Sequence, residues 1–334
     1  MLKISLLGTG RIGKMHAELI NLNPKTQLEY VYDINKEASE EIARKYGSNV
    51  ANSSEEAISN PNVDVVFISS ATPTHINYIL SAAKAGKAIF CEKPIELDIN
   101  KVESCREELK KYKVPIHIGF NRRFDPSHKA AKDAKDKGEI GNIEKIIITS
   151  RDPAPPGIAY LRDAGGMYRD MTIHDFDLMS YILGDDQIEK VFATGSILFD
   201  EDVKEINDMD TAMIVMKSKS GVLCHINNSR RATYGYDQRI ELFGSKGMVI
   251  SDNISTTSLK KYSDEVTKAN EPLYHFFIER YKDAYRIQLE VFTDCIINNK
   301  PTAVNFDDGR NALILANGAV KSFKTGKFEA INFS

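Results

Sequence analysis

The residue types best suited to acid–base chemistry lie near the middle of the chain, where an aspartate precedes a histidine by four residues. These are Asp170 and His174, in the segment GGMYRDMTIHDFD. A helix over residues 170–184 would place both side chains on one face. The carboxylate would then fix the imidazole tautomer and stabilise the imidazolium, as a general base needs when it takes a hydroxyl proton while hydride leaves. The alternative is that Asp170 caps the helix and His174 packs in the interior.

A lysine at the end of a predicted strand is the second candidate. The apolar run AIFC at residues 88–91 predicts a buried strand, and Glu92, Lys93 and Pro94 follow it at once. Because ligands bind beyond the carboxyl ends of parallel strands, Lys93 would face the reacting atoms. There it could orient a hydroxyl oxygen and lower the pKa of neighbouring groups. The alternative is a lysine solvated in a loop.

The hydride acceptor is indicated by a glycine-rich turn between a predicted strand and a predicted helix. The turn reads GTGRIG, with glycines at positions 8, 10 and 13. Gly8 permits the tight turn, Gly10 lets the backbone approach a pyrophosphate, and Gly13 lets helix and strand pack closely. Asp33 ends a second predicted strand twenty residues after Gly13. Strand, glycine turn, helix, strand and acid in this order predict a dinucleotide-binding domain.

The acid at the strand end also predicts which dinucleotide binds. The carboxylate of Asp33 can accept hydrogen bonds from a ribose 2′-hydroxyl and would repel a 2′-phosphate, and neither Ile34 nor Asn35 supplies an arginine. NAD is therefore expected rather than NADP. Further candidate cofactor contacts lie in the turn and at strand ends. They are Arg11, Ile12, Ile34, Ser70, Thr72, His75, Glu92, Lys93 and Arg122.

The fold class follows from the order of the elements that position these residues. Strand and helix patterns alternate up to residue 120, which predicts a Rossmann-type, doubly wound parallel sheet of the α/β class. From residue 143 onward most segments alternate apolar with polar residues, which predicts a second, α+β domain with a large, mostly antiparallel open sheet. We expect domains over residues 1–120 and 121–308. A strand-like stretch at 301–306 precedes a C-terminal helix and tail over 309–334, which could pack back on the first domain.

Charge and cysteine usage exclude several classes of protein. A net charge of −3 offers no basic surface for nucleic acid or an anionic membrane. No apolar run approaches the length needed to span a bilayer. The four cysteines are far apart and form no CxxC pair, so they predict free thiols in a reducing compartment and no metal site. We expect a cytoplasmic protein.

The motifs together resemble the Gfo/Idh/MocA oxidoreductase family, and within it the inositol dehydrogenase branch. The matching segments run along nearly the whole chain and read GTGRIG, CEKP, GFNRRFDP, SRDPAPP, GGMYRDMTIHDFD and YGYDQRIELFGSKG. The resemblance implies NAD(H) and, in many members, a homotetramer built sheet to sheet. It implies that Lys93, Asp170 and His174 are the catalytic set, with His174 as acid/base. Arg122 and Tyr236, or Tyr234, would lie at the substrate.

The same resemblance implies the reaction. The expected activity is NAD-dependent oxidation of a secondary ring hydroxyl of a cyclic polyol, myo-inositol to scyllo-inosose. Arg151 and Asp152 stand where some inositol dehydrogenases carry a His-Asn pair, and they are further candidate substrate contacts. The alternatives are another polyol or aldose, such as scyllo-inositol or glucose, and a non-catalytic dinucleotide sensor on the same fold.

Overall fold

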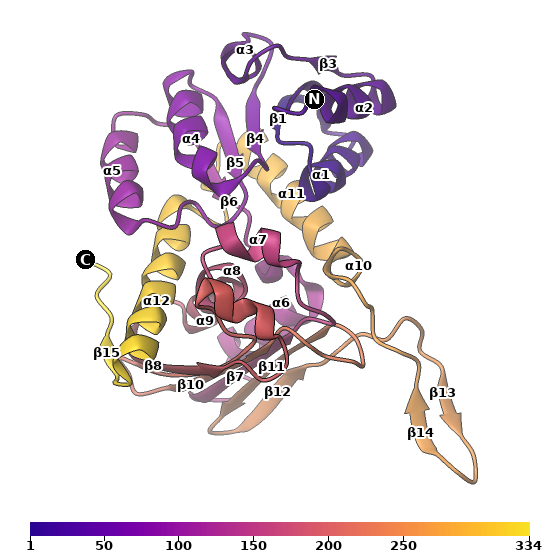
Figure 1. The fold of residues 1–334 in the computed structure, drawn as a ribbon, viewed down its shortest axis with the longest axis vertical. Helices are drawn as coiled ribbons and strands as arrows, with labels where there is room; N and C mark the ends of the chain where they lie inside the picture. Colours follow the sequence, from indigo (N-terminus) through magenta and orange to yellow (C-terminus); the bar gives the residue numbers. More distant parts are fainter. The chain divides into compact units, whose positions relative to one another are not determined.

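A computed structural model describes residues 1–334, and the chain divides into two compact units (Figure 1). The first unit contains residues 1–121 and 285–311. The second unit contains residues 122–284 and 312–334. Each unit therefore has a core built from two separate stretches of the chain.

This division differs from the boundaries expected at residues 120 and 308, and the buried side chains give the reason. Leu289 and Phe292 are buried in the apolar cluster of the first unit, although a second domain over 121–308 would have contained them. Leu315 is buried in the cluster of the second unit, although the tail over 309–334 was expected to be able to return to the first domain. The division into two units is therefore set by the apolar residues of two late helices, one that carries Leu289 and Phe292 and one that carries Leu315.

The first unit is a six-stranded parallel sheet with the order β3-β2-β1-β4-β5-β6. Its strands are β1 (Leu2–Leu7), β2 (Thr26–Tyr32), β3 (Asn49–Val50), β4 (Val65–Ile68), β5 (Ala88–Cys91) and β6 (Ile116–Ile118). Its helices are α1 (Arg11–Leu22), α2 (Lys36–Tyr46), α3 (Ser54–Ser59), the 3-10 turn η1 (Thr72–Thr74), α4 (His75–Lys84) and α5 (Ile99–Leu109). Every residue of β4 and β5 is buried, as a parallel sheet covered on both faces requires. The predicted doubly wound sheet is confirmed.

The second unit is a seven-stranded sheet with the order β12-β11-β7-β10-β9-β8-β15. Its strands are β7 (Ile143–Arg151), β8 (Ile188–Ser196), β9 (Thr211–Ser218), β10 (Leu223–Ser229), β11 (Asp237–Gly244), β12 (Gly247–Ser251) and β15 (Glu329–Ala330). Its helices, apart from the later ones described below, are η2 (Asn121–Phe124), α6 (Pro126–Asp136), α7 (Ile158–Asp163), α8 (Met167–Asp170), α9 (Ile173–Leu183) and η3 (Glu201–Ile206). All neighbouring strands are antiparallel except β7 and β10. The predicted mostly antiparallel sheet is confirmed.

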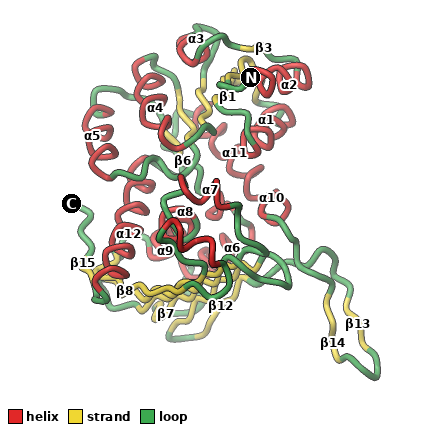
Figure 2. Tube along the Cα trace, in the orientation of Figure 1, coloured by secondary structure: helices red, strands yellow, loops and turns green.

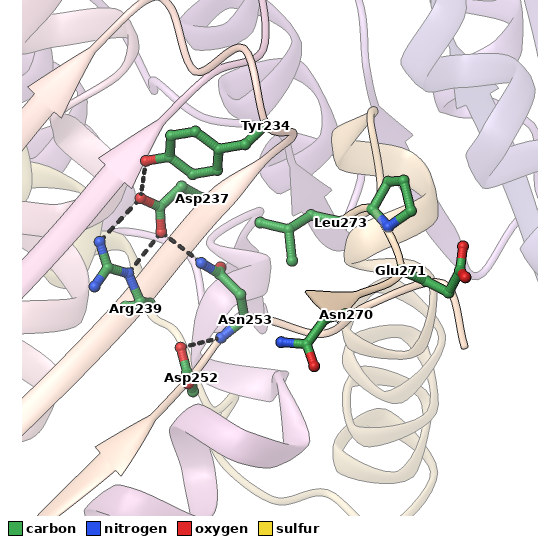
Figure 3. A pocket seen from close by; sticks show the side chains of 9 residues that line it. Tyr234, Asp237, Arg239, Asp252, Asn253, Asn270, Glu271 and Leu273 are labelled. Atoms are coloured by element: carbon green, nitrogen blue, oxygen red, sulfur yellow. Dashed lines mark hydrogen bonds and ion pairs between the residues drawn. The ribbon is translucent and has the colours of Figure 1, made fainter. Parts of the chain in front are cut away.

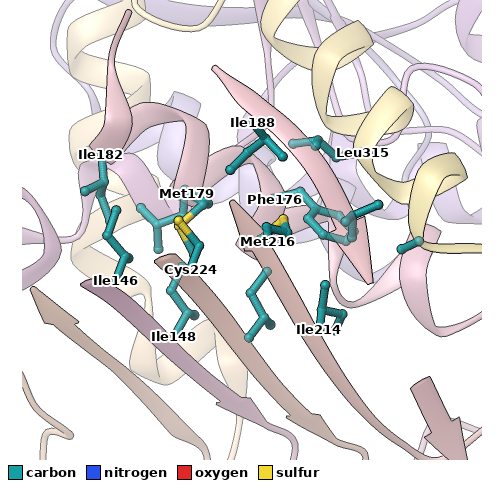
Figure 4. Close-up of a cluster of buried hydrophobic side chains, with 14 of the residues drawn as sticks. Ile146, Ile148, Phe176, Met179, Ile182, Ile188, Ile214, Met216, Cys224 and Leu315 are labelled. Atoms are coloured by element: carbon teal, nitrogen blue, oxygen red, sulfur yellow. The ribbon is translucent and has the colours of Figure 1, made fainter. Parts of the chain in front are cut away.

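One face of this sheet carries the core and the other is open. Figure 1 shows α6, α8 and α9 on one face, where Ile214 and Met216 of β9 point into the buried cluster drawn in Figure 4. On the opposite face Met213 and Val215 of the same strand are 47% and 42% exposed. Strand alternation thus produces a second apolar surface that no helix of the unit covers.

Two segments differ from their expected form. The helix expected over 170–184 is interrupted at residues 171–172, where the N–H of Thr172 bonds to the carbonyl of Met167, five residues back. Later in the chain, the short α10 (Phe277–Arg280) precedes the longer α11 (Lys282–Ile297). The stretch 301–306 is not a strand, so that prediction was wrong.

The C-terminal helix starts earlier than expected because of its cap. Asn305 and Asp308 exchange hydrogen bonds between side chain and backbone at 2.7 and 3.0 Å, and α12 (Phe306–Thr325) begins between them. The preceding residue, Val304, accepts a hydrogen bond from the backbone of Ile118 in β6 at 3.0 Å. The segment therefore lies beside the sheet edge without forming a strand of its own.

A short hairpin completes the second unit. Strands β13 (Lys260–Tyr262) and β14 (Thr267–Asn270) pair only with each other, and Figure 2 shows them projecting away from the seven-stranded sheet. Leu259, just before β13, and Tyr262, at its end, are mostly exposed. Among all helices of the chain, none combines the length and apolar character that crossing a bilayer demands.

Candidate active site

The glycine turn has the conformation that the sequence predicts. Gly8 has a φ of +95°, and a Cβ there would lie 2.5 Å from the backbone nitrogen of Ser70. A Cβ on Gly13 would collide with the carbonyl oxygen of Gly8. A Cβ on Gly10, at the start of α1, would meet nothing within 4 Å. Gly8 and Gly13 are thus required by packing, whereas Gly10 leaves the N-terminus of α1 open to an anionic ligand.

The acid at the end of β2 lies against this turn. Oδ2 of Asp33 accepts hydrogen bonds from the backbone N–H of Thr9 at 2.6 Å and from its hydroxyl at 3.0 Å. Ile34 is 92% exposed, and Arg11 is also exposed. Asp33 and the glycine turn therefore form one cradle, with no arginine beside the carboxylate in the sequence that follows it. These residues fit a dinucleotide that carries a free ribose hydroxyl.

The strand-end loops that follow β4 and β5 are joined by a buried histidine. His75 places Nδ1 2.8 Å from the carbonyl oxygen of Pro94 and Nε2 3.0 Å from that of Ser70. Burial lowers the pKa of His75, although both carbonyl contacts oppose the shift. Ser70 also shares a hydrogen bond with Thr74, while Thr72 in η1 is partly exposed. The structure thus places His75 under these loops, where it ties the cofactor-side turn to the loop of Lys93.

The residue before Lys93 is fixed by a histidine that sequence reasoning missed. Oε1 of Glu92 lies 2.7 Å from Nε2 of His16 on α1, and its Oε2 accepts the backbone N–H of Lys93 at 3.2 Å. A Cβ on Gly119 would lie 2.7 Å from that carboxylate. Glu92, which follows β5, is therefore bonded to α1 and packed closely against Gly119. His16 and Glu92 are 76 residues apart, so no local pattern could have paired them.

The proposed catalytic acid is held by two residues that the sequence analysis did not single out. The hydroxyl of Tyr160 donates to Oδ1 of Asp170 at 2.7 Å, and Arg230 places two N–H groups 3.3 and 3.4 Å from Oδ2. Asp170 ends α8, and His174 lies in the first turn of α9. The two side chains therefore belong to separate short helices, and the prediction of one continuous helix that carries both on one face was wrong.

Arg122 lies in a buried network beside α9. Its Nη1 donates to Oδ1 of Asp175 at 2.5 Å and to the hydroxyl of Ser150 at 2.8 Å. The amide of Asn228 donates to the other oxygen of Asp175 at 2.8 Å. Burial raises the pKa of Asp175, and Arg122 opposes that shift. Arg122 is thus held by β7 and α9, and β10 holds its partner Asp175.

The remaining candidate substrate residues converge on one end of the seven-stranded sheet. Arg151, at the end of β7, donates to the hydroxyl of Tyr234 at 2.9 Å, and that hydroxyl donates to Asp237 at 2.6 Å. Tyr236 is buried, and its ring meets Tyr281 edge to face with centroids 6.0 Å apart. Figure 3 shows Tyr234 and Asp237 at a pocket of about 430 Å³ beside the base of the β13–β14 hairpin. Neither Asp170 nor any residue of α9 lines this pocket.

Asp152 directly follows Arg151 at the same end of the sheet. Burial raises the pKa of Asp152 to about 6, although the charges of Arg230 and Arg122 oppose the shift. Its backbone N–H donates to the carbonyl oxygen of Ser229 at 2.9 Å, which fixes it next to the end of β10. A carboxyl group of this kind can donate or accept a hydrogen bond near neutral pH, which suits recognition of a hydroxyl.

Comparison with known proteins decides the family. Residues 2–120 match the model described as the oxidoreductase family with an NAD-binding Rossmann fold, and residues 128–250 match the GFO/IDH/MocA C-terminal domain. The chain belongs to the Gfo/Idh/MocA oxidoreductase family. The predicted family and the predicted NAD-binding domain are confirmed. In this Gfo/Idh/MocA protein, the glycine turn and Asp33 form the cradle that fits the cofactor.

Individual relatives are closely similar along the whole chain. Myo-inositol 2-dehydrogenase of Thermotoga maritima is 44% identical over 97% of this chain and 96% of its own length. The crystal structure of a myo-inositol dehydrogenase from Corynebacterium glutamicum has a TM-score of 0.96 and 40% identity, covering 99% of both chains. The structure of scyllo-inositol dehydrogenase from Lactobacillus casei with bound cofactor NAD(H) and scyllo-inositol has a TM-score of 0.91 and 27% identity, again covering 99% of both chains. This Gfo/Idh/MocA oxidoreductase is thus similar to enzymes named for inositols.

Proposed function

We propose that this oxidoreductase oxidises one secondary ring hydroxyl of myo-inositol to a ketone, forming scyllo-inosose, with NAD as the hydride acceptor. The observation that carries the proposal is the Asp170 carboxylate, 8% exposed and held at both oxygens, four residues before His174. A relative 44% identical to this chain bears the name of the same activity. Bound NAD supplies a nicotinamide ring that takes up the hydride.

The roles of the residues follow from the bonds that change. The ring carbon loses hydride and its hydroxyl group loses a proton. The carbon–oxygen bond thereby becomes a carbonyl double bond. His174 accepts the proton, and Asp170 supports the resulting imidazolium. Lys93 at the end of β5 orients the same oxygen and stabilises negative charge on it. The expected NAD contacts of Arg11, Ile12, Ser70, Thr72 and Glu92 belong to the same proposal.

Recognition of the polyol is assigned to the polar side chains at the sheet end. Arg122, Arg151, Asp152 and Tyr234 offer donors and acceptors to ring hydroxyls, and Tyr236 offers an aromatic face to the C–H side of the ring. The bidentate donor geometry of arginine suits a pair of adjacent hydroxyls. This set supports a substrate with several neighbouring hydroxyl groups.

A panel of cyclic polyols and sugars tests the proposal, with NADH formation followed by absorbance. We expect the highest kcat/KM with myo-inositol. A higher value with scyllo-inositol or glucose would replace the assigned substrate and keep the reaction class; the relative solved with scyllo-inositol makes that isomer the first comparison. NAD binding without turnover on any member of the panel would instead support a dinucleotide sensor.

We also propose that the protein is a homotetramer assembled through the open face of the second unit's sheet. Apolar side chains on neighbouring strands point outward there and are one third to one half exposed. They are Met213, Val215, Leu223, Phe243, Met248 and Ile250. An apolar surface of this extent favours association with another sheet. The four free cysteines support a cytoplasmic location, where thiols stay reduced.

A further inference from the structure

A fully buried arginine lies beside the proposed catalytic acid. Arg230 directly follows β10 and is 1% exposed. Its Nη1 and Nη2 lie 3.3 and 3.4 Å from Oδ2 of Asp170, while the Tyr160 hydroxyl donates to Oδ1 at 2.7 Å. The carboxylate is therefore held at both oxygens by side chains from two segments that are distant in sequence.

Arg230 is itself held in place by contacts that lead back to the helix of Asp170. Its Nη2 lies 3.8 Å from Oδ2 of Asp208, and its backbone N–H donates to the carbonyl of Asp210 at 2.8 Å. Oδ1 of Asp208 accepts the backbone N–H of Met167, the first residue of α8, at 2.8 Å. Asp208 thus caps α8 at one end and contacts Arg230, which holds Asp170 at the other end.

The geometry differs from that of the arginine–aspartate pairs elsewhere in this unit. Arg123 binds both oxygens of Asp177 at 2.6 and 2.9 Å, and Arg280 binds Asp125 at 2.5 Å. These short bonds are typical of charge-assisted pairs that stabilise a fold. Arg230 instead directs two longer contacts at a single oxygen of its aspartate.

Tyr160, the other residue that contacts the carboxylate of Asp170, is suited to donate a hydrogen bond. Burial and the charge of Asp170 raise the pKa of Tyr160, so its hydroxyl keeps its proton and donates to Oδ1. The Tyr160 residue as a whole is 55% exposed, so its ring is not needed to fill the core. The hydroxyl of Tyr160 therefore has a contact to make and little packing to supply.

We propose that Arg230 and Tyr160 are positioning residues of the dehydrogenase, which fix the carboxylate of Asp170 in the orientation that supports the imidazolium of His174. This inference rests on the proposed function. Neither residue takes or gives a proton in the reaction. They act through Asp170, by preventing its carboxylate from rotating when charge develops on the imidazole.

The test compares Arg230→Met and Tyr160→Phe with the unmodified protein, using the polyol of the panel that is oxidised fastest. We expect kcat to fall about tenfold to a hundredfold in each, because misplacement of a catalytic group has effects of this size. NAD affinity, measured by fluorescence quenching, should stay within about twofold. Arg230→Lys should recover part of the loss. Tyr160→Phe keeps the test decisive should Arg230→Met not fold, since it removes one hydroxyl from a half-exposed residue.

Arg280→Met is the matched control because the side chains of Arg280 and Arg230 are both 1% exposed, and Arg280 is also bound to a carboxylate, that of Asp125. It should lower the melting temperature and leave kcat per folded molecule within about threefold. If Arg230 acts only through Asp170, replacing it has no further effect on kcat once the carboxylate of Asp170 is removed. The double variant Asp170→Asn, Arg230→Met should therefore have the same kcat as Asp170→Asn alone. Effects of the two substitutions that multiply would overturn the inference, as would normal turnover of both Tyr160→Phe and Arg230→Met. Absence of turnover in the unmodified protein counts against the proposed function, whereas normal turnover of the variants counts against this inference alone.

Discussion

Oδ2 of Asp33 lies 2.6 Å from the backbone nitrogen of Thr9 and 3.0 Å from its hydroxyl oxygen. The acid that ends β2 therefore supports the glycine turn as well as carrying the charge expected to select the cofactor. The same side chain thus holds the glycine turn and supplies the carboxylate that is expected to favour NAD over NADP.

The first prediction concerns this carboxylate. Unmodified protein should use NAD with a clearly higher kcat/KM than NADP. Asp33→Ser combined with Ile34→Arg should narrow or reverse that preference, because it replaces a repulsive carboxylate with a phosphate partner. Since the change also removes the contacts to Thr9, kcat/KM with NAD should fall more than kcat/KM with NADP rises. Asp64→Asn is the control, because Asp64 also accepts a backbone N–H, that of Lys3 at 2.8 Å. Equal use of both cofactors by the unmodified protein would contradict the assignment.

The second prediction concerns Lys93 at the end of β5. Lys93→Ala should lower kcat by about two orders of magnitude or more, the usual scale for a group that acts in the transition state. NAD affinity should change far less, as measured by fluorescence quenching. Lys101→Ala is the control, because the Lys101 side chain is 64% exposed and forms only a 3.7 Å ion pair with Glu96. Full activity of the Lys93 variant would mean that Lys93 is a solvated loop residue.

The third prediction concerns His174 and Asp170. Oxidation should increase with pH through a single ionisation, as the neutral imidazole becomes available to accept the hydroxyl proton. His174→Ala should lower kcat about a hundredfold or more and remove that ionisation from the profile. Asp170→Asn should lower the rate and move the ionisation to lower pH, because the imidazolium loses its carboxylate.

The buried partner of Asp170 adds an expectation for stability. Asp170→Asn leaves the guanidinium of Arg230 with less negative charge beside it, so the melting temperature should fall together with the rate. If His174→Ala melted early yet kept normal turnover per folded molecule, the pair would be structural and the acid–base assignment would be wrong.

The fourth prediction concerns stability against pH at Asp152. Burial raises the pKa of Asp152 to about 6, above the value of ~3.9 expected in the unfolded chain. The folded state therefore binds this proton more tightly, and the contribution of Asp152 to stability decreases as the pH rises from about 4 to about 6. Asp152→Asn should remove that loss, which is ~3 kcal/mol for about two pKa units, so its melting temperature at pH 7.5 should exceed that of the unmodified protein by several degrees and match it at pH 4.

A second buried carboxylate should behave in the opposite way. Burial alone would raise the pKa of Asp237, but hydrogen bonds from Arg239, Tyr234 and Asn253 lower it. Its stabilising contribution is present above the unfolded pKa and is lost as the pH falls, so Asp237→Asn should lower the melting temperature at pH 7.5. Thermal melts of both variants across pH 4–8 measure the contrast, and parallel curves for the two would contradict it.

The fifth prediction concerns the open face of the sheet. Light scattering of the unmodified protein should give the mass of a tetramer. Met213→Glu combined with Val215→Glu should yield a smaller species, because buried carboxylates at a sheet-to-sheet contact lack partners. Leu198→Glu is the control, since Leu198 is 68% exposed and lies beyond the end of β8. A mass that the paired change leaves unaltered would place the assembly surface elsewhere.

The sequence alone determined the elements whose causes are local. The glycine turn could be predicted because GTGRIG stands between a strand pattern and a helix pattern. The structure shows why two of its glycines are required, since a Cβ on Gly8 or Gly13 would collide with neighbouring backbone. The parallel sheet could be predicted because short, continuous apolar runs suit strands covered on both faces. Asp33 was identifiable at the end of β2 because it closes such a run at a fixed distance from the turn. Each of these signals lies within a few tens of residues.

Tertiary structure decided everything that depends on partners far apart in the chain. Arg230 reaches Asp170 across 60 residues, and His16 reaches Glu92 across 76, so no spacing rule connects them. The interruption between α8 and α9 also has a tertiary cause, since the hydroxyl of Thr172 bonds to the side chain of Asn228 in β10 at 2.6 Å. Periodicity predicts which face of a helix is apolar. It does not contain the buried polar contacts that end a helix or orient a carboxylate, because those form only when distant strands meet.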